Sequence, residues 1–556
     1  MQDDDLSEIK IDDQKIIDNK ELNIFEALVP VVILMILLAI NIFGFEGEMM
    51  GGYSNQYILL IGGFVAFMGG LLNKVTPLVM LKEILENLKS VVVPIMILFL
   101  VGALAGTWLI SGVIPAMVYY GLQVLSPEIF LPASVIIAAI ISIATGSSWT
   151  TSATVGIALV GIGTALGINP GMIAGAVISG AYFGDKMSPL SDTTNLAPAM
   201  AGTDLFTHIR YMAFTTVPTI LLTLVVFGII SASIEPTGSS DTEFILSTID
   251  KYFNITPWLF LVPIGVVGLI LLKTKPLIAL GFGVVLAIIF AFIFQPKLIN
   301  EISDSSTTTV VNSIFSDTNI EIDDSEYMAA LTESDIDKIK TDEDGLRKLF
   351  SDDDLKGVYT NESLKEFFSL DYKNSNTIEN KAENLEKLIT IKRLKKLFGA
   401  GGMKGMLWTI YLIVCAMVFG GIMDGIGALA RITKALLSVA SSVFGLFATT
   451  IISCLGLNVI ASDQYLAIVI PGKMFKKAYE DKGLAPENLS RTLEDSGTVT
   501  SVLIPWNTCG AYQSGVLGVG IGEYFVYAIF NWLSPFTTLL FAALRIKIKM
   551  LTTKTN

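Results

Sequence analysis

ATGSSWTTSA at residues 144–153 is a run of small and hydroxyl-bearing residues in the middle of an apolar stretch, 129–168. A second apolar stretch, 443–470, is interrupted in the same way by GLNVIASDQY at 456–465. Irregular backbone at membrane depth is tolerated only where it is buried in protein or lines a cavity, because lipid offers no hydrogen bonds. We therefore expect two hairpins, each broken at its centre and each returning to its own side of a membrane.

The other apolar runs around these hairpins are close to the roughly 20 residues that a helix needs to cross a bilayer. A chain in which 52% of residues are hydrophobic and only 16% are charged is typical of a multi-pass membrane protein. The acidic start of the chain predicts that the first span is retained and is not a cleaved signal peptide. The expected spans are 25–43, 57–72, 91–110, 170–184, 211–230, 257–272, 277–294, 406–421, 499–515 and 523–544.

The net charge of −14 comes from two polar segments. Residues 1–26 hold 9 acidic and 3 basic residues, and residues 297–405 hold 22 and 15, so the rest is nearly neutral. This balance excludes nucleic-acid binding, because no basic face is available for phosphates. Three scattered cysteines exclude a disulfide scaffold, and no phosphate-binding Gly-Lys-Ser/Thr loop or Ser/His/Asp set is present. We expect neither an enzyme nor a bound cofactor.

The order of spans and hairpins repeats along the chain. Three spans, a hairpin and two spans form a first repeat at 25–235, and 257–296 with 406–545 form a second that begins on the opposite side. We therefore predict an all-α polytopic membrane protein with two inverted-topology repeats, each of about five transmembrane helices plus a re-entrant hairpin, a plan found in secondary transporters. Residues 1–24 are an acidic tail, and 297–405 are a polar insertion.

Lysine and arginine placement predicts that both termini face the cytoplasm and that the insertion is extracytoplasmic. Only the basic cluster Lys392, Arg393, Lys395 and Lys396 disagrees. Within the insertion, 362–368 and 382–398 have helical patterns. The acidic run 352–354 favours a solvated surface over a calcium loop, because no EF-hand spacing follows it.

Polar residues beside the helix breaks supply the chemistry. Carboxylate, hydroxyl and amide oxygens, with carbonyls freed by Pro189, are the hard ligands that a cation such as Na⁺ needs. Carboxylates are costly in a membrane and mark functional sites by default. The candidate cation and proton ligands are Ser191, Asp192, Thr193 and Asn195 in the first repeat, and Asn458, Asp463, Asp495, Ser496 and Thr498 in the second.

Structural alternatives stand beside these assignments. Asp192 could cap a helix, and Asp495 or Glu494 could pair with Arg491 one turn away. For Asp185 and Lys186, a position at the membrane interface is as plausible an interpretation as a role in the site. His208, the sole histidine, is expected at the inner surface with no task, although it could sense pH.

Several motifs resemble the NhaC family of sodium/proton antiporters. They are GAYFGDKMSPLSDTTNLAP at 180–198, AGTDL at 201–205, LSRTLEDSGTVT at 489–500 and PWNTCG at 505–510, with TGSSW at 145–149 and SDQY at 462–465. The resemblance covers nearly the whole membrane body but not 297–405. It implies secondary transport, often by an elevator movement, and by analogy a homodimer. The family also includes malate/lactate exchangers and amino-acid carriers, so the substrate is implied only loosely.

Three hypotheses follow. The first is a plasma-membrane antiporter that exports cytoplasmic Na⁺ in exchange for external H⁺. The second is a Na⁺- or H⁺-coupled carrier of an organic acid or amino acid, bound by Ser147, Ser148, Thr150, Thr151 and Asn507; the lack of basic residues at the hairpin centres argues against a dicarboxylate. The third is a membrane receptor or scaffold that binds a partner through 297–405, which leaves the polar breaks unexplained.

Overall fold

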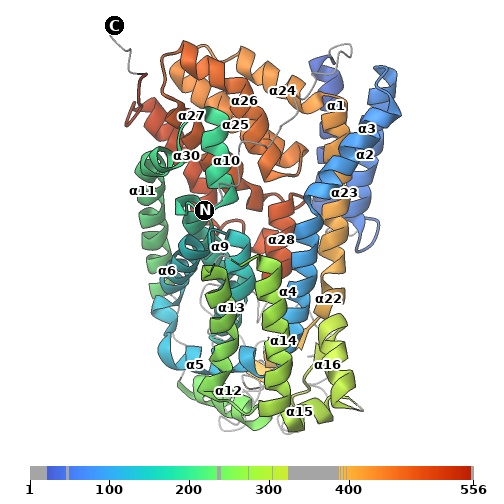
Figure 1. Cartoon of the computed structure of the whole chain (residues 1–556), viewed down its shortest axis with the longest axis vertical. Coiled ribbons are helices and arrows are strands. Elements are labelled where there is room, and N and C mark those ends of the chain that lie inside the picture. The colour runs from blue at the N-terminus through green and yellow to red at the C-terminus, as the bar shows by residue number, and fades with distance from the viewer. Residues whose placement is uncertain are drawn as a thin grey trace, which may run out of the picture.

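The computed structural model describes residues 22–45, 49–233, 239–272, 274–303, 305–323, 387, 390–391, 394–395 and 397–551. These residues are mostly helical, and the long helices α4, α6, α11, α14 and α23 run along the length of the molecule (Figure 1). Eight helices among them are long and apolar enough to cross a membrane, and the bent pair 242–252 and 257–271 would be a ninth. The expectation of an all-α polytopic membrane protein is confirmed.

The helices follow the predicted runs closely in the first half. The chain opens with α1 (Ile24–Phe45), α2 (Ser54–Leu72), α3 (Pro77–Ser90), α4 (Val92–Ile110) and α5 (Val113–Val124). It continues through α6 (Pro127–Thr145), α7 (Ser148–Thr151), the π-helix η2 (Ser152–Gly156), α8 (Ile157–Ala165), α9 (Pro170–Met187), α10 (Asp192–Ala201) and α11 (Leu205–Ala232).

The middle of the chain holds α12 (Ser239–Tyr252), η3 (Pro257–Phe260), α13 (Leu261–Leu271), α14 (Pro276–Phe294), α15 (Pro296–Glu301) and α16 (Ser306–Phe315). Strands β1 (Thr318–Asn319) and β2 (Gly399–Ala400) pair antiparallel and are followed by α22 (Gly402–Gly405). The paired strands therefore bring the two ends of the 324–398 segment together.

The second half holds α23 (Leu407–Gly425), α24 (Ala428–Ser438), α25 (Val443–Ile460), α26 (Gln464–Asp481) and α27 (Pro486–Leu493). It then passes through the π-helix η4 (Glu494–Thr498) and the 3-10 helix η5 (Ser501–Leu503) to α28 (Thr508–Leu517), α29 (Ile521–Tyr524) and α30 (Ile529–Ala543). The prediction of continuous spans at 499–515 and 523–544 is wrong. The backbone between Ile504 and Asn507 leaves the helix, and residues 525–528 separate α29 from α30.

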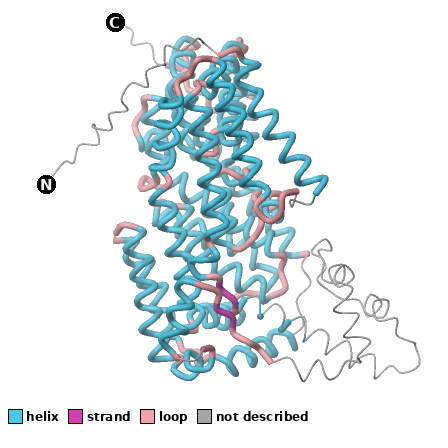
Figure 2. Tube along the Cα trace, turned by 90° about the vertical axis from the view of Figure 1, so that its right-hand side faces the viewer, coloured by secondary structure: helices cyan, strands magenta, loops and turns pink. Residues whose placement is uncertain are grey.

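Both described ends of the chain lie at the end of the molecule where α24, α26 and α27 gather (Figure 1). Arg431 of α24 donates from Nε to the Leu22 carbonyl at 2.8 Å, and Leu484 pairs with Met550. The strands β1 and β2 lie toward the other end (Figure 2). The expected acidic tail up to residue 21, the patterns at 362–368 and 352–354, and Lys392, Arg393 and Lys396 lie outside the described residues, and 382–398 lies largely outside them.

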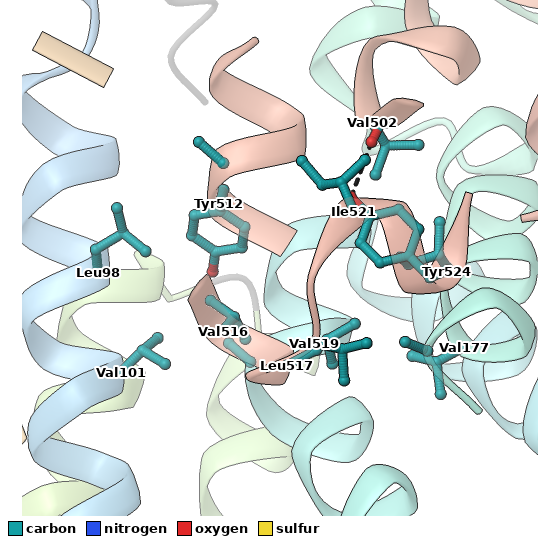
Figure 3. Close-up of a cluster of buried hydrophobic side chains, with 14 of the residues drawn as sticks. Leu98, Val101, Val177, Val502, Tyr512, Val516, Leu517, Val519, Ile521 and Tyr524 are labelled. Atoms are coloured by element: carbon teal, nitrogen blue, oxygen red, sulfur yellow. Dashed lines mark hydrogen bonds between the residues drawn. The ribbon is translucent and has the colours of Figure 1, made fainter. Parts of the chain in front are cut away.

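The outer surface is apolar, as lipid contact requires. Phe214, Leu221, Val225 and Ile229 of α11 are all exposed and recur at helical spacing on one face of this helix. A soluble monomer rarely exposes apolar area of this extent, so this stripe is suited to a bilayer. The interior of the molecule is apolar as well. Leu98 of α4 and Tyr512 of α28, for example, belong to one buried hydrophobic cluster (Figure 3).

Glycines set how closely α9 approaches α6. A Cβ at Gly180 would lie 2.2 Å from the Val135 carbonyl oxygen, and one at Gly184 would lie 2.5 Å from that of Ala139. Distances this short exclude any side chain, so these glycines allow the helices to touch along their backbones. This contact fixes the position of Asp185 and Lys186, which follow Gly184 directly.

Candidate functional site: four capped helix breaks and a buried charge cluster

Four helices begin at breaks in the membrane body, and each begins with a side-chain cap. A helix start leaves backbone N–H groups without partners, and a hydroxyl, carboxylate or amide oxygen satisfies them. The caps are Ser147 before α7, Ser191 before α10, Asp463 before α26 and Asn507 before α28. One structural role of the polar runs in the sequence is therefore to cap the helices that begin at the breaks.

In the first half, the two breaks lie against each other. Ser188 donates from Oγ to the Ile143 carbonyl at 2.8 Å, and a Cβ at Gly146 would lie 2.6 Å from Leu190 Cβ. Asp185 accepts through Oδ2 from both the backbone N and the Oγ of Ser148, at 3.0 and 2.7 Å. The hairpin tip is thus held by a buried carboxylate at the end of α9.

In the second half, the two breaks are joined by a pair of asparagines. Asn507 donates from Nδ2 to the Asn458 carbonyl at 3.0 Å, and the Thr508 N–H donates to the Ser462 carbonyl at 2.9 Å. Asn458 in turn donates to the Gly497 carbonyl at 2.7 Å. This network links α25, the start of α28 and the π-helix η4.

Aromatic residues connect the two halves. Trp149 of α7 stacks on Tyr512 of α28 with ring centroids 4.0 Å apart, and Tyr512 donates to the Trp149 carbonyl at 3.2 Å. Tyr465 at the start of α26 lies within electrostatic range of Asp192, Asp463 and Asp185. The carboxylates beside the breaks of both halves therefore lie in one region.

A buried ion pair also joins the halves. Lys186 of α9 donates from Nζ to Asp495 Oδ1 in η4, and both side chains are fully buried. Thr215 of α11 donates to Asp495 Oδ2 at 2.8 Å, and Thr538 of α30 donates to the same oxygen. Both carboxylate oxygens of Asp495 are therefore occupied, which is the arrangement in which a buried pair is tolerated.

Two further buried charges on the same segment lack such partners. Arg491 is fully buried with its guanidinium 4.6 Å from the Tyr211 ring centroid, and its Nε and Nη2 have no hydrogen bond within the described chain. Glu494 is also fully buried, beside Lys186 and the Thr498 hydroxyl, and its contact with Thr498 falls short of a well-aligned hydrogen bond. The guanidinium is stabilised by the aromatic face, and Lys186 supplies the nearest positive charge to Glu494.

The predicted site residues divide into capping groups and open groups. Ser191 Oγ lies 3.2 Å from Thr193 Oγ1, and Asn195 donates to the Pro189 carbonyl at 3.0 Å. Asp192 is exposed, and none of the hydrogen bonds found among the described residues ends on its carboxylate. Asp463 caps α26 through Oδ1 alone. Asp192 and the Oδ2 atom of Asp463 are therefore open for a cation.

The remaining predicted groups are mostly satisfied within the protein. Ser496 donates from Oγ to the Thr492 carbonyl, and Thr151 donates to the Ser147 carbonyl at 2.9 Å. Thr150 donates to Ser147 Oγ at 3.2 Å. Thr498 is buried, and its hydroxyl lies beside the Glu494 carboxylate without a well-aligned hydrogen bond.

Three structural alternatives are wrong. Asp185 and Lys186 are not interfacial, because both are buried, the first at the hairpin tip and the second in the ion pair. Asp495 pairs with Lys186 and not with Arg491, which lies over Tyr211. His208 is not at the surface, because it is buried with Nδ1 2.8 Å from Ser490 Oγ.

Sequence reasoning did not find Thr215 and Thr538, which bind Asp495. Both lie in apolar helices where a lone threonine looks unremarkable, since its hydroxyl can bond to its own helix. A partial signal is present in α11, where Thr215, Thr219 and Thr223 recur every four residues on one face. This polar stripe predicts contact with a polar group inside the protein.

A sequence profile described as the Na⁺/H⁺ antiporter family matches residues 180–337 and 382–546, more than half of the chain. The chain belongs to the Na⁺/H⁺ antiporter family. The match begins inside α9 and includes the Lys186–Asp495 pair and three of the four breaks. The predicted resemblance to this family is confirmed.

Named relatives of this Na⁺/H⁺ antiporter family member match most of its length. It is 34% identical to the Na(+)/H(+) antiporter NhaC of Alkalihalophilus pseudofirmus over 84% of this chain and 85% of that one. It is 32% identical to NhaC of Bacillus subtilis over 83% of this chain and 85% of that one. The Malate-2H(+)/Na(+)-lactate antiporter of Bacillus subtilis is 29% identical over 86% of both chains.

Proposed function

We propose that this protein is a secondary active transporter of the plasma membrane that exports cytoplasmic Na⁺ in exchange for external H⁺. The observation that carries the proposal is the meeting of open carboxylates from both halves at the helix breaks. Asp192 and Asp463 each lie at the start of a helix and within electrostatic range of the same tyrosine, Tyr465. Family membership supports ion exchange as the activity.

The cation is bound, in this proposal, by oxygen ligands from the two halves. Asp192 and Asp463 Oδ2 are the open carboxylate oxygens, and small hard cations prefer such ligands. Protonation of these carboxylates removes the charge that holds Na⁺, and bound Na⁺ disfavours protonation, so the two ions are coupled. The wider proposed set is Ser191, Thr193 and Asn195 in the first half, and Asn458, Asp495, Ser496 and Thr498 in the second.

The order of elements supports two inverted repeats. In each half a broken hairpin is followed by a broken helix and a further helix. In the first half these are α6–α8, α9–α10 and α11, and in the second half they are α25–α26, α27–α28 and α30. The short helix before each hairpin, α5 or α24, starts after a left-handed glycine, Gly112 or Gly427. We extend the proposal to an elevator movement and a homodimer by analogy with transporters of this plan.

The arrangement of chain ends supports the proposed topology. Both described ends lie near α24 and α27, and β1 and β2 lie toward the opposite end (Figures 1 and 2). We propose that the termini are cytoplasmic and that 297–405 is extracytoplasmic. Cysteine labelling from outside intact cells tests this, because a cysteine in place of Ser305 is then labelled and one in place of Lys482 is not.

The experiment for the function uses purified protein in liposomes with a trapped pH dye. Na⁺, Li⁺, K⁺, malate, lactate and single amino acids are added in turn. Proton movement upon addition of Na⁺ alone is expected, and no response to Na⁺ under any gradient would contradict the proposal. Asp192→Asn is expected to abolish exchange in folded protein. Asp204→Asn is its matched control, since Asp204 is an exposed N-cap acid whose capping role asparagine retains.

A second candidate is a coupled carrier of an organic acid or amino acid, favoured by the similarity to the Malate-2H(+)/Na(+)-lactate antiporter. Its proposed donors are Ser147, Ser148, Thr150, Thr151 and Asn507. In the described conformation their side chains already bond within the protein, as the Ser148 hydroxyl does to Asp185. A liposome response that requires malate, lactate or an amino acid would favour this candidate.

The third hypothesis, a receptor or scaffold, is tested by deleting 324–386 and joining the cut ends through a flexible linker. The shortened chain keeps the β1–β2 pairing and the buried Phe398, which packs on Phe253, so it is expected to fold. Retained exchange would assign the insertion an accessory role. Loss of exchange in folded protein would show that the insertion takes part in transport.

A further inference from the structure

The lipid-facing side of α11 ends in a positive charge. Its exposed apolar stripe runs from Phe214 to Ile229, which is roughly 22 Å at 1.5 Å per residue and fits within the roughly 30 Å hydrocarbon core of a bilayer. Arg210 is exposed one turn before Phe214 on the same face, and α11 has no other lysine, arginine or acidic residue. When the stripe lies in hydrocarbon, Arg210 therefore lies at the depth of the lipid headgroups.

The turn that follows α30 adds further cations at this place. Lys547 is exposed, and its Nζ lies 4.6 Å from the centroid of the Phe214 ring, within the range of a cation–π contact. Arg545 is exposed in the same turn, two residues earlier. We call Arg210, Arg545 and Lys547 the basic triad. Helix α11 and the end of α30 thus bring positive charge to the upper boundary of the apolar stripe.

The backbone of this turn is held from inside the protein. The Lys547 carbonyl accepts hydrogen bonds from Tyr211 Oη and, at 3.4 Å, from Nη1 of the buried Arg491. The Lys549 N–H donates to Tyr211 Oη at 3.1 Å, and the Lys549 carbonyl accepts from the Ala485 N–H at 2.9 Å. These bonds use main-chain atoms of Lys547, so its ammonium group stays available at the surface.

The basic triad has no acidic partner in the part of the chain that the structure describes. None of the ion pairs found there includes any of its three residues. Two acids at this end of the protein are already engaged, because Glu487 pairs with Lys549, and Asp204 accepts from the Thr207 N–H at 2.9 Å. The positive charge of the triad is therefore complementary to an anion.

The surroundings of the basic triad favour a lipid over a free anion. Leu544 and Ile546 alternate with the two cations of the turn and are exposed, as are Phe206 and Phe214 on α11. A free phosphate gains nothing from these apolar side chains, whereas acyl chains are buried against them. Basic clusters directly beside membrane helices attract anionic headgroups, and long basic side chains reach the headgroups from an apolar surface.

We propose that the basic triad binds the headgroup phosphate of an anionic phospholipid, whose acyl chains lie along the apolar stripe of α11. The inference depends neither on the transported solute nor on the side of the membrane that the termini face. Tyr211 and Arg491 tie the turn after α30 to α11 and α27. A lipid that binds this turn only in the folded protein stabilises the folded state.

The test compares phosphatidylglycerol with phosphatidylcholine of the same acyl chains. Each lipid is added to purified full-length protein in a neutral detergent, and native mass spectrometry measures its dissociation constant. The wild type is expected to bind phosphatidylglycerol more tightly, by a factor that falls as ionic strength rises. Loss of one basic residue near a headgroup weakens binding by roughly fivefold. Arg210→Gln/Lys547→Gln should therefore weaken phosphatidylglycerol binding by roughly 25-fold and leave phosphatidylcholine binding unchanged.

Two further variants accompany this measurement. Arg210→Lys keeps the charge and is expected to bind phosphatidylglycerol as the wild type does. Lys477→Gln is the matched control, because it removes an exposed lysine from α26 at the same end of the molecule, and it should leave the affinity unchanged (Figure 1). The inference is overturned if the double variant binds phosphatidylglycerol as tightly as the wild type. Displacement of the lipid by an equal concentration of inorganic phosphate would also overturn it.

Thermal unfolding provides a second measurement. Without added lipid, the double variant should unfold at the wild-type temperature, because both substituted side chains are exposed. Phosphatidylglycerol is expected to raise the unfolding temperature of the wild type and of Lys477→Gln, but not that of the double variant. An equal rise in the wild type and the double variant would show that the lipid acts at another place, and the assignment to the basic triad would fail.

Discussion

Two lysine–aspartate pairs at different places in the molecule show how environment changes the role of the same chemistry. Lys186 and Asp495 are fully buried between α9 and η4, whereas Lys404 and Asp317 beside the β1–β2 pair leave 61% and 56% of their side chains exposed. Water and salt screen an exposed pair, so it contributes little. A buried pair has lost its hydration, so each charge depends on the other.

The buried pair therefore joins two parts of the chain that are 309 residues apart. Asp495 also binds Thr215 and Thr538, so four elements meet at one carboxylate: α9, η4, α11 and α30. A group with this many partners is suited to hold a site in position.

The largest effect is expected when the buried pair loses one member. Lys186→Met leaves Asp495 buried without its counter-charge, and breaking a buried pair in this way costs about 3–5 kcal/mol. We expect a much lower unfolding temperature and loss of the monodisperse peak in size-exclusion chromatography. The double variant Lys186→Met/Asp495→Asn removes both charges and is expected to recover most of the stability. Equal stability of Lys186→Met and the wild type would contradict a structural role for the pair.

The comparison also shows what the sequence can predict. The two hairpin breaks, most spans and the family could be predicted, because runs of apolar residues and polar interruptions are local patterns. The Lys186–Asp495 pair could not, because nothing in the residues near position 186 indicates a partner 309 residues away. Asp185 and Lys186 looked interfacial because adjacent charges at a helix end usually are.

The sequence indicated which polar residues lie beside the breaks, but not which of them cap a helix. The sequence located Ser191, Asp463 and Asn507 beside breaks, and the structure makes each a helix cap. Whether a carboxylate is open or occupied depends on donors from distant helices, such as Thr538 for Asp495. All of the cation-ligand assignments, Asp192 included, stay predictions.

The next largest effect concerns the packing that places Lys186. A Cβ at Gly184 would lie 2.5 Å from the Ala139 carbonyl oxygen, so Gly184→Ala must push α9 away from α6. Overpacking of this kind costs about 1–3 kcal/mol, and we expect exchange to fall because Lys186 moves with the helix. Gly228→Ala is the control, since nothing lies within 4 Å of a Cβ there. If thermal unfolding shows both variants to be equally stable, α9 does not depend on this contact.

A smaller effect is expected from the caps at equivalent breaks. Removal of a cap costs about 1 kcal/mol, which is the expected loss for Ser191→Ala. Asn507→Ala should cost more, because Asn507 also donates to the Asn458 carbonyl and would leave that group buried without its donor. Unfolding temperatures of the two variants in the same detergent measure the difference. An equal or reversed order would show that the asparagine pair adds nothing beyond capping.

The smallest effect is expected at the exposed pair. Lys404→Met removes its charge where water already screens it, so the unfolding temperature should stay within measurement error of the wild type at neutral pH. The hydrogen bond that Lys404 donates to Asp317, together with the carboxylate's charge, raises the pKa of Lys404. The pair's contribution is therefore present at neutral pH and is lost as pH rises through the lysine range. A clear destabilisation of Lys404→Met at neutral pH would mean that the surroundings of β1 and β2 are less hydrated than the exposure of Lys404 indicates. The difference between the two pairs would then come from the hydrogen bonds of Thr215 and Thr538 to Asp495 more than from burial.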